Sequence, residues 1–157
     1  MSRACCFTGH RELPSETDPA YSALKEALQR AVERAVTEFG CTTFYAGGAI
    51  GFDLLAAETV LRNQAVHPEL NLVLCVPYLG YNARFSPKDL KRYRAVSEGA
   101  LETRILSDRY TPFCFSQRNR YMVDRSDVLI AYVRRMQSGS GQTLRMAKNR
   151  ELEILLL

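Results

Sequence analysis

The sequence predicts an α/β fold, a mostly parallel and doubly wound sheet of about six strands with helices on both faces. Short apolar runs alternate along the chain with segments whose apolar residues recur at helical spacing. The runs Leu72–Val76 and Asp127–Val133 are apolar at almost every position, which is typical of parallel strands buried on both faces. With 157 residues, we expect a single domain over residues 1–157.

The predicted elements follow one another without a repeat or a linker. The expected strands are Arg3–Phe7, Thr42–Ala46, Leu72–Val76, Thr103–Leu106, Asp127–Val133 and Glu153–Leu157. The expected helices begin near Pro19, Phe52, Pro87, Phe115 and Gln142 and end near Gly40, Ala65, Gly99, Arg125 and Asn149. Capping residues support these boundaries, because Asp18 and Ser86 each stand before a proline at a helix start and Gly40 is a typical helix end.

Two charge patterns on the helices have structural explanations. Arg120 and Asp124 have the spacing of an i,i+4 ion pair. The helix that starts at Pro87 carries four basic residues, which we interpret as a solvated face in preference to a binding patch.

Right-handed crossovers restrict the order of the strands in the sheet. With Thr103–Leu106 at one edge, and the strands numbered along the chain, we expect the spatial order 4-3-2-1-5-6. The winding then reverses between the first and the fifth strand. Ligands of such sheets bind beyond the carboxyl ends of the strands, at that reversal.

The bulk composition restricts the kind of protein. It has 46% hydrophobic and 24% charged residues, as an ordinary globular protein has. The net charge of +4 suits an anionic ligand but is too small to indicate nucleic-acid binding by itself. The chain shows no membrane-spanning run, no secretory signal and no metal-ligand spacing among its five cysteines and two histidines. We therefore expect reduced cysteines, no metal, no membrane partner and a cytoplasmic location.

The segment Gly47–Asp53 joins a strand to a helix through three glycines. Glycine allows the backbone to approach a ligand closely, and a helix N-terminus offers free N–H groups to an anion. A steric turn without a ligand is the alternative explanation. Three further polar segments, Thr8–Arg11, Arg118–Asn119 and Ser138–Thr143, are expected on the same rim of the sheet. Four segments that converge on one crevice favour a ligand site.

The candidate site residues have alternative roles that the sequence leaves open. Arg11 and Arg118 suit phosphate oxygens but could form ion pairs, and Asp53 suits a ribose hydroxyl or the helix dipole. His10, Asp53 and Glu58 are weak catalytic candidates, and a histidine in a turn is more often a hydrogen-bonding residue. The expected ligand-binding residues are Thr8, Gly9, His10, Arg11, Gly47, Gly48, Ala49, Gly51, Phe52, Asp53, Pro77, Tyr78, Arg118, Asn119, Ser138, Gly139, Ser140, Gly141 and Thr143.

These motifs resemble those of the SLOG superfamily. The resemblance rests on Phe7–Arg11, Gly47–Asp53, Arg118–Arg120 and Ser138–Thr143 in this order, and the opening Cys6–Arg11 is most similar to the YpsA-like branch. Other members are DNA-processing protein A (DprA/Smf) and the LOG phosphoribohydrolases. The resemblance implies a Rossmann-like fold and a site for a nucleotide or nucleotide-derived ligand such as ADP-ribose, NAD or a nucleoside monophosphate.

The resemblance to the LOG branch is incomplete. LOG hydrolases resemble one another in a Pro-Gly-Gly-x-Gly-Thr turn that a catalytic glutamate follows closely. Here no carboxylate stands within the six residues after Thr143, although glycosidic cleavage generally needs one. We therefore expect ligand binding or sensing more than catalysis, and an N-glycosidic hydrolase remains an alternative.

The resemblance to DprA raises a second alternative, the binding of single-stranded nucleic acid. Such binding requires a basic track with aromatic rings on which bases stack. Arg11, Arg84 and Arg118, together with Tyr78, Tyr81 and Phe85, are the residues that could supply it. A terminal strand at an exposed edge, Glu153–Leu157, is in turn a candidate for pairing with a second copy of the chain.

Overall fold

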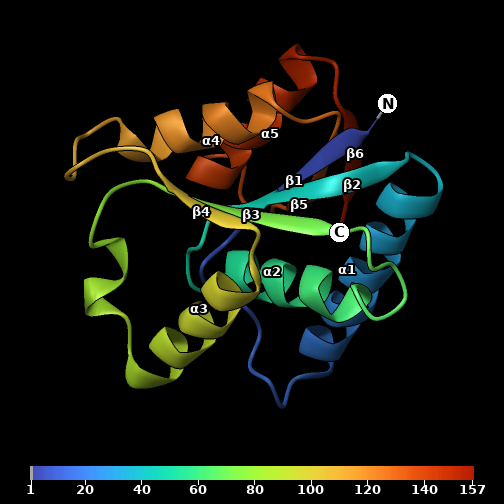
Figure 1. Cartoon of the computed structure of the whole chain (residues 1–157), viewed down its shortest axis with the longest axis horizontal. Helices are drawn as coiled ribbons and strands as arrows, with labels where there is room; N and C mark the ends of the chain where they lie inside the picture. The colour runs from blue at the N-terminus through green and yellow to red at the C-terminus, as the bar shows by residue number, and fades with distance from the viewer. Residues whose placement is uncertain (1) are drawn as a thin grey trace.

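The computed structural model describes residues 2–157 and contains one six-stranded sheet (Figure 1). The strands are β1 (Arg3–Gly9), β2 (Cys41–Ala46), β3 (Asn71–Val76), β4 (Glu102–Ile105), β5 (Val128–Tyr132) and β6 (Glu153–Leu156). Every pair of neighbouring strands is parallel, and their order is β4-β3-β2-β1-β5-β6. The predicted Rossmann-like α/β fold and the predicted strand order are confirmed.

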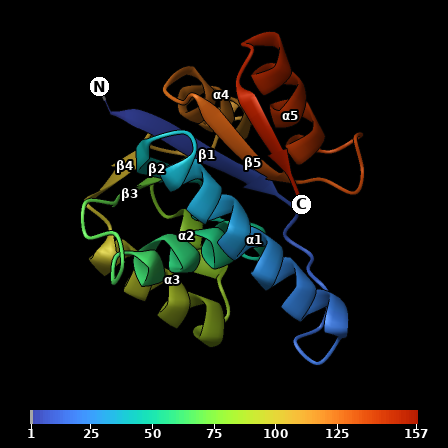
Figure 2. The same ribbon diagram turned by 90° about the vertical axis from the view of Figure 1, so that its right-hand side faces the viewer.

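Helices cover both faces of the sheet. They are α1 (Pro19–Thr37), α2 (Phe52–Asn63), α3 (Pro87–Gly99), α4 (Cys114–Asp124) and α5 (Gly139–Asn149), with a 3-10 turn η1 (Tyr81–Arg84) before α3. The first three helices lie on one side of the sheet, and α4 and α5 lie on the other (Figures 1 and 2). None of the helices within residues 2–157 combines the length and the apolar character that crossing a bilayer requires.

Each face of the sheet has its own hydrophobic core. Alternate side chains of β1 point to opposite faces, so Cys5 packs with the α1–α3 side and Cys6 with the α4–α5 side. Both thiols are free and fully buried, as expected for cysteines inside apolar strands. Burial raises the pKa of Cys6 to about 12, which keeps this thiol protonated and unreactive.

The structure differs from the sequence-based boundaries at two elements of the later site. β1 continues to Gly9 because Thr8 and Gly9 pair with Ala131 and Tyr132 of β5. α5 begins at Gly139, three residues earlier than expected, because Ser138 caps it. Both differences extend regular structure into the segments that were expected to be loops around a ligand.

The predicted ion pair between Arg120 and Asp124 is wrong. Asp124 instead binds Arg150, just beyond the end of α5, with an Oδ1–Nη2 distance of 2.7 Å. Arg120 is exposed on α4 and has no ion-pair partner within residues 2–157. The spacing made the i,i+4 pair available, but the packing of α4 against α5 provides a closer partner.

Candidate functional site

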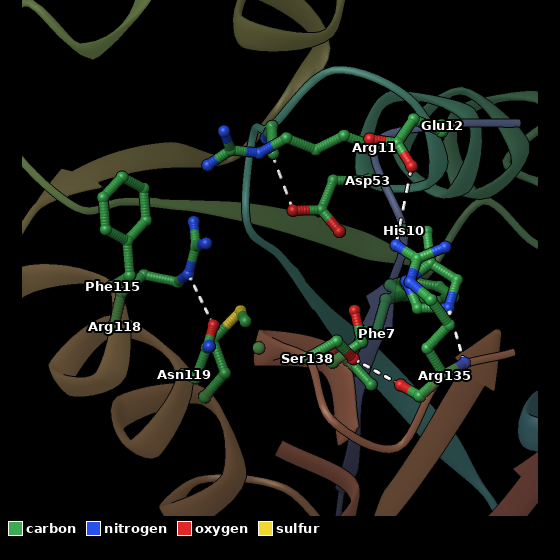
Figure 3. Close-up of a pocket in the computed structure, with 16 residues that line it drawn as sticks. Phe7, His10, Arg11, Glu12, Asp53, Phe115, Arg118, Asn119, Arg135 and Ser138 are labelled. Atoms are coloured by element: carbon green, nitrogen blue, oxygen red, sulfur yellow. Dashed lines mark hydrogen bonds and ion pairs between the residues drawn. The ribbon is translucent and has the colours of Figure 1, made fainter. Parts of the chain in front are cut away.

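A cleft of about 290 Å³ lies at the carboxyl edge of the sheet, where the winding reverses between β1 and β5 (Figure 3). Its walls come from the end of β1, the first turns of α2 and α4, and the loop that enters α5. The expected site residues that line it are Thr8, Gly9, His10, Arg11, Ala49, Asp53, Arg118, Asn119, Ser138, Gly139 and Ser140. The structure therefore brings residues of all four sequence motifs to one place.

Arg118 is the most deeply placed cation of the cleft, with 5% of its surface exposed. Its Nη1 donates to the carbonyl oxygens of Gly47 at 2.5 Å and Cys75 at 3.3 Å, and its Nε donates to Asn119 Oδ1 at 2.8 Å. No acceptor within residues 2–157 binds its Nη2. Every buried side-chain nitrogen or oxygen within residues 2–157 has a hydrogen-bond partner. Since Nη2 of Arg118 has none, this atom is not buried and has access to solvent. The guanidinium is thus fixed on one edge and free to donate from the other.

Asp53 faces the same cleft from the first turn of α2 and is 7% exposed. Its Oδ2 accepts from the amide of Ala49 at 3.4 Å. Burial raises the pKa of this carboxyl, and the nearby Arg118, the Ala49 amide and Arg11 partly oppose the shift. A buried carboxyl held beside two guanidinium groups is a suitable acceptor for a ligand hydroxyl.

The glycines of the turn before α2 leave the space in which Asp53, Arg118 and the Arg11 backbone approach one another. A side chain at Gly47 would place its Cβ 2.4 Å from Asp53 Oδ2 and 2.7 Å from Arg118 Nη1. A side chain at Gly51, whose φ is +79°, would meet the carbonyl oxygen of Arg11 at 2.2 Å. The amide of Phe52 donates to the His10 carbonyl at 3.1 Å. Gly47, Gly48 and Gly51 do not line the cleft; they allow its wall segments to approach one another.

His10 has a specific hydrogen-bonding role. Its Nε2 lies 2.7 Å from the amide nitrogen of Arg134 and 3.4 Å from that of Arg135. Since backbone amides only donate, Nε2 accepts and the ring carries its proton on Nδ1. Burial lowers the pKa of His10, and so do Arg135 and Arg134, whereas Glu12 raises it. His10 therefore anchors the loop between β5 and α5 as a neutral ring, and its Nε2 is occupied by the protein.

The start of α5 contributes free backbone donors. Ser138 caps the helix by accepting from the Gly141 amide at 3.0 Å and donates to the Arg135 carbonyl at 2.6 Å. The amides of Gly139 and Ser140, which line the cleft, have no acceptor within residues 2–157. A helix of eleven residues adds the positive end of its dipole at this point.

Several expected site residues lie elsewhere. Glu58 is bound by Arg92 of α3, with an oxygen–nitrogen distance of 2.6 Å, and does not line the cleft. The structure thus gives this weak catalytic candidate an ion-pair role, because α2 turns its side chain toward α3. Phe52 is fully buried between Phe7 and Tyr132 and belongs to the core.

The remaining expected ligand-binding residues do not line the cleft. Thr143 is fully buried, and its hydroxyl donates to the Gly139 carbonyl at 3.0 Å, so it stabilises the first turn of α5. At Gly141, a Cβ would lie within van der Waals overlap of the Met136 carbonyl oxygen. Pro77 is buried at the end of β3, and Tyr78 lines a neighbouring groove.

Sequence reasoning missed five residues of the cleft wall. They are Phe7, Glu12, Phe115, Met122 and Arg135. Arg135 pairs with Glu12 at 3.5 Å, and both side chains are exposed at the rim. The position of Arg135 in the loop that follows a buried strand was a usable signal, because every loop at the carboxyl edge of a parallel sheet faces the same crevice. The placement of Phe115 depends on packing that the sequence does not show.

Comparison with known proteins identifies relatives that match more than four fifths of the chain. A UPF0398 protein from Bacillus licheniformis is 29% identical over 134 residues, which cover 83% of this chain and 73% of the relative. A UPF0398 protein from Halalkalibacterium halodurans is 28% identical over 131 residues, which cover 82% of this chain and 69% of the relative.

Solved structures share the fold at low sequence identity. DNA processing protein A (DprA) from Streptococcus pneumoniae matches with a TM-score of 0.68 and 18% identity over 99% of this chain. DprA from Helicobacter pylori, whose structure concerns its single-stranded DNA binding mode, matches with a TM-score of 0.64 and 19% identity over 98% of this chain. This chain spans 50% of the first of these proteins and 64% of the second.

The comparisons agree with the resemblance carried by the four motifs. The model that matches residues 5–153 is described as the YspA SLOG family, and it covers every residue that lines the cleft and the sheet from Cys5 of β1 as far as the start of β6. This chain belongs to the SLOG superfamily, in its YpsA-like branch.

Proposed function

We propose that the cleft binds a nucleotide or a nucleotide-derived small ligand through its phosphate. The observation that carries the proposal is Arg118, a nearly buried guanidinium with one edge fixed by protein and Nη2 without an acceptor among residues 2–157. Asp53 lies nearby, but it does not bind Nη2, so this edge of a nearly buried cation is free to donate to an anion. A phosphate oxygen at the free edge would satisfy it.

The remaining groups of the cleft support the same ligand class. The amides of Gly139 and Ser140 offer a helix N-terminus to an anion, as in other phosphate sites. Arg11 and Arg135 add positive charge at the rim, while Asp53 offers a deep oxygen acceptor for a sugar hydroxyl. The combination of donors for an anion and one acceptor for a hydroxyl matches a phosphorylated ribose.

A hydrolase remains the alternative for the same ligand, and its catalytic group would be Asp53. Glu58 is held by Arg92, and Nε2 of His10 is occupied by two backbone amides. A raised pKa suits a general acid, so a proton on Asp53 is the feature on which hydrolysis would depend. Incubation with AMP, NAD and ADP-ribose followed by chromatography separates turnover from binding.

Single-stranded nucleic acid is a second candidate ligand. It is supported by the fold shared with DprA and by the aromatic groove beside Arg11 and Arg84. A mobility shift with a short oligonucleotide, weakened steeply by salt, is the result expected for such binding.

The main test measures ligand binding directly. Small molecules released from denatured protein are identified by mass spectrometry, and thermal shifts are measured with AMP, ADP-ribose and NAD. We expect a bound or stabilising ligand that contains phosphate. Arg118→Lys keeps a charge but loses the planar fork, and should weaken binding about tenfold or more. Arg94→Lys is the matched control, because Arg94 is exposed on α3 outside the cleft.

Two outcomes would contradict the proposal. One is the absence of any co-purifying phosphate compound together with no thermal shift across the panel. The other is equal affinity of the wild type and a folded Arg118→Lys variant, which would leave the guanidinium as a purely structural donor to Gly47 and Cys75.

A further inference from the structure

A second cavity, a groove of about 660 Å³, adjoins the cleft and is lined by aromatic rings. The rings are those of Tyr78, Tyr81, Phe85, Tyr110 and Phe115. Tyr78, Tyr81 and Phe85 come from the segment that joins β3 to α3, whereas Tyr110 precedes α4 and Phe115 lies in its first turn. Only the fold brings these two segments together, at the same edge of the sheet as the cleft.

The rings meet edge to face. Tyr78 lies with its ring centroid 5.5 Å from that of Tyr81 and 5.7 Å from that of Tyr110, at interplanar angles of 81° and 85°. Tyr81 and Phe115 are 5.8 Å apart at 70°. No pair within this cluster is stacked face to face. None of the five rings is fully buried, and Tyr110 is 60% exposed, so solvent reaches this aromatic surface.

Arg11 and Phe115 connect the groove to the cleft, because both side chains line both cavities. The Arg11 guanidinium lies 5.4 Å from the centroid of the Phe115 ring, and its Nη2 donates to the Tyr81 hydroxyl at 3.3 Å. In Figure 3 the Arg11 guanidinium lies above that of Arg118, and the Phe115 ring lies to the left of Arg118. A ligand that extends from the cleft past Arg11 therefore reaches the aromatic rings.

We propose that this groove binds the base of the ligand whose phosphate lies in the cleft, with Tyr81 and Phe115 as its contact surface. The inference rests on the proposed function and extends it from a phosphate site to a site for phosphate and base. A nucleobase is planar and apolar on its faces, so it stacks on aromatic side chains and on guanidinium planes. A free nucleotide and one nucleotide within a single strand both offer this combination of a phosphate and a base.

Calorimetric titration with two ligands tests the groove separately from the cleft. AMP carries a base and ribose 5-phosphate lacks it, while both present the same phosphate. We expect AMP to bind more tightly to the wild type. Phe115→Leu and Tyr81→Leu should weaken AMP by roughly 5- to 100-fold, the range associated with one base–aromatic stack, and should weaken ribose 5-phosphate much less than AMP. Tyr81→Phe is the matched control, since it keeps the ring, and should retain AMP binding.

The outcomes distinguish the two proposals. Equal affinity for AMP and ribose 5-phosphate, unaffected by Phe115→Leu and Tyr81→Leu, would overturn the groove proposal and leave the phosphate site intact. Failure of both AMP and ribose 5-phosphate to bind, with a single-stranded oligonucleotide bound in a Phe115-dependent way, would identify the strand as the source of the base. Failure of all three ligands would refute the phosphate site and the groove together.

Discussion

The turn after β2 and the turn after β5 both lead from a buried strand into a helix through glycines, and a phosphate contact was expected at each. After β2, three polar groups bind other parts of the protein: the Gly47 carbonyl binds Arg118, the Ala49 amide binds Asp53 and the Phe52 amide binds the His10 carbonyl. The amides of Gly48 and Ile50 have no acceptor within residues 2–157, but neither residue lines the cleft. After β5, the residues Gly139 and Ser140 line the cleft, and their amides have no acceptor within residues 2–157.

The difference shows what a glycine motif does and does not specify. A glycine marks a place where the backbone approaches something closely. At Gly51 that neighbour is the backbone of Arg11, and at Gly141 it is the carbonyl of Met136. At Gly139, apart from its chain neighbours and the backbone of α5, no atom of residues 2–157 lies within 4 Å of an added Cβ, so this position has open space beside it. The turn after β2 thus shapes the walls of the cleft, whereas the start of α5 lines the cleft.

The largest expected effect on stability comes from adding a side chain in the turn after β2. Gly51→Ala combines an unfavourable φ of +79° with a Cβ 2.2 Å from the Arg11 carbonyl oxygen. We expect a loss of about 3 kcal/mol in the free energy of unfolding, measured by urea denaturation. Gly139→Ala is the control and should change stability by about 1 kcal/mol or less. Equal losses in the two variants would contradict the assignment of different roles to the two turns.

Removal of a helix cap should have a smaller effect on stability, and the two capping serines provide a matched pair of variants. Ser138 and Ser86 both cap helices with their hydroxyls, but only Ser138 lines the cleft. Replacement of either serine by alanine should cost about 1 kcal/mol of stability. Only Ser138→Ala should also weaken AMP binding, because it loosens the segment that presents the Gly139 and Ser140 amides. A similar loss of AMP affinity in Ser86→Ala would show that the effect follows stability alone.

The neutral state of His10 predicts a pH dependence of stability. The pKa of His10 is lowered in the folded state, so the unfolded chain binds the proton more tightly. The stability that the neutral His10 contributes to the folded state is present above about pH 6.5 and is lost as the pH falls through the folded-state pKa. His10→Gln keeps an acceptor without a comparable titration, and should show a smaller drop in urea midpoint between pH 7.5 and pH 5.5. A drop equal to that of the wild type would assign the titration to other groups.

Asp53 should contribute a pH dependence of stability opposite in direction to that of His10. Its pKa is raised in the folded state, so its contribution to stability is greatest at low pH and is lost as the pH rises through the folded-state pKa. Asp53→Asn has no charge to bury. The melting temperature of this variant should therefore rise relative to the wild type from pH 4 to pH 7. A relative decrease over this range would mean that the carboxylate is stabilised by Arg118 more than burial destabilises it.

The sequence was sufficient for the fold because the signals are local. Continuous apolar strands, helix caps and the handedness of crossovers together predict the order β4-β3-β2-β1-β5-β6. The convergence of the four motifs on one rim follows from the same topology, since all strands end at the same edge. Arg118 and Gly139 were expected there for this reason, and both line the cleft.

The contacts between distant segments were not predictable. The pairing of Asp124 with Arg150, and of Glu58 with Arg92, depends on how helices pack side by side. The anchoring of a loop by His10 connects residues 124 positions apart. The aromatic groove joins two segments that meet only at the edge of the sheet. In each case the sequence shows suitable residue types, and the fold selects the partner.

The most direct test of the central claim is an amide NMR titration of the labelled protein with AMP. If the turn after β5 faces the ligand, the resonances of Gly139 and Ser140 should shift most, with those of Gly47 and Gly48 nearly unchanged. Large shifts at Gly47 and Gly48 with none at Gly139 and Ser140 would contradict the account.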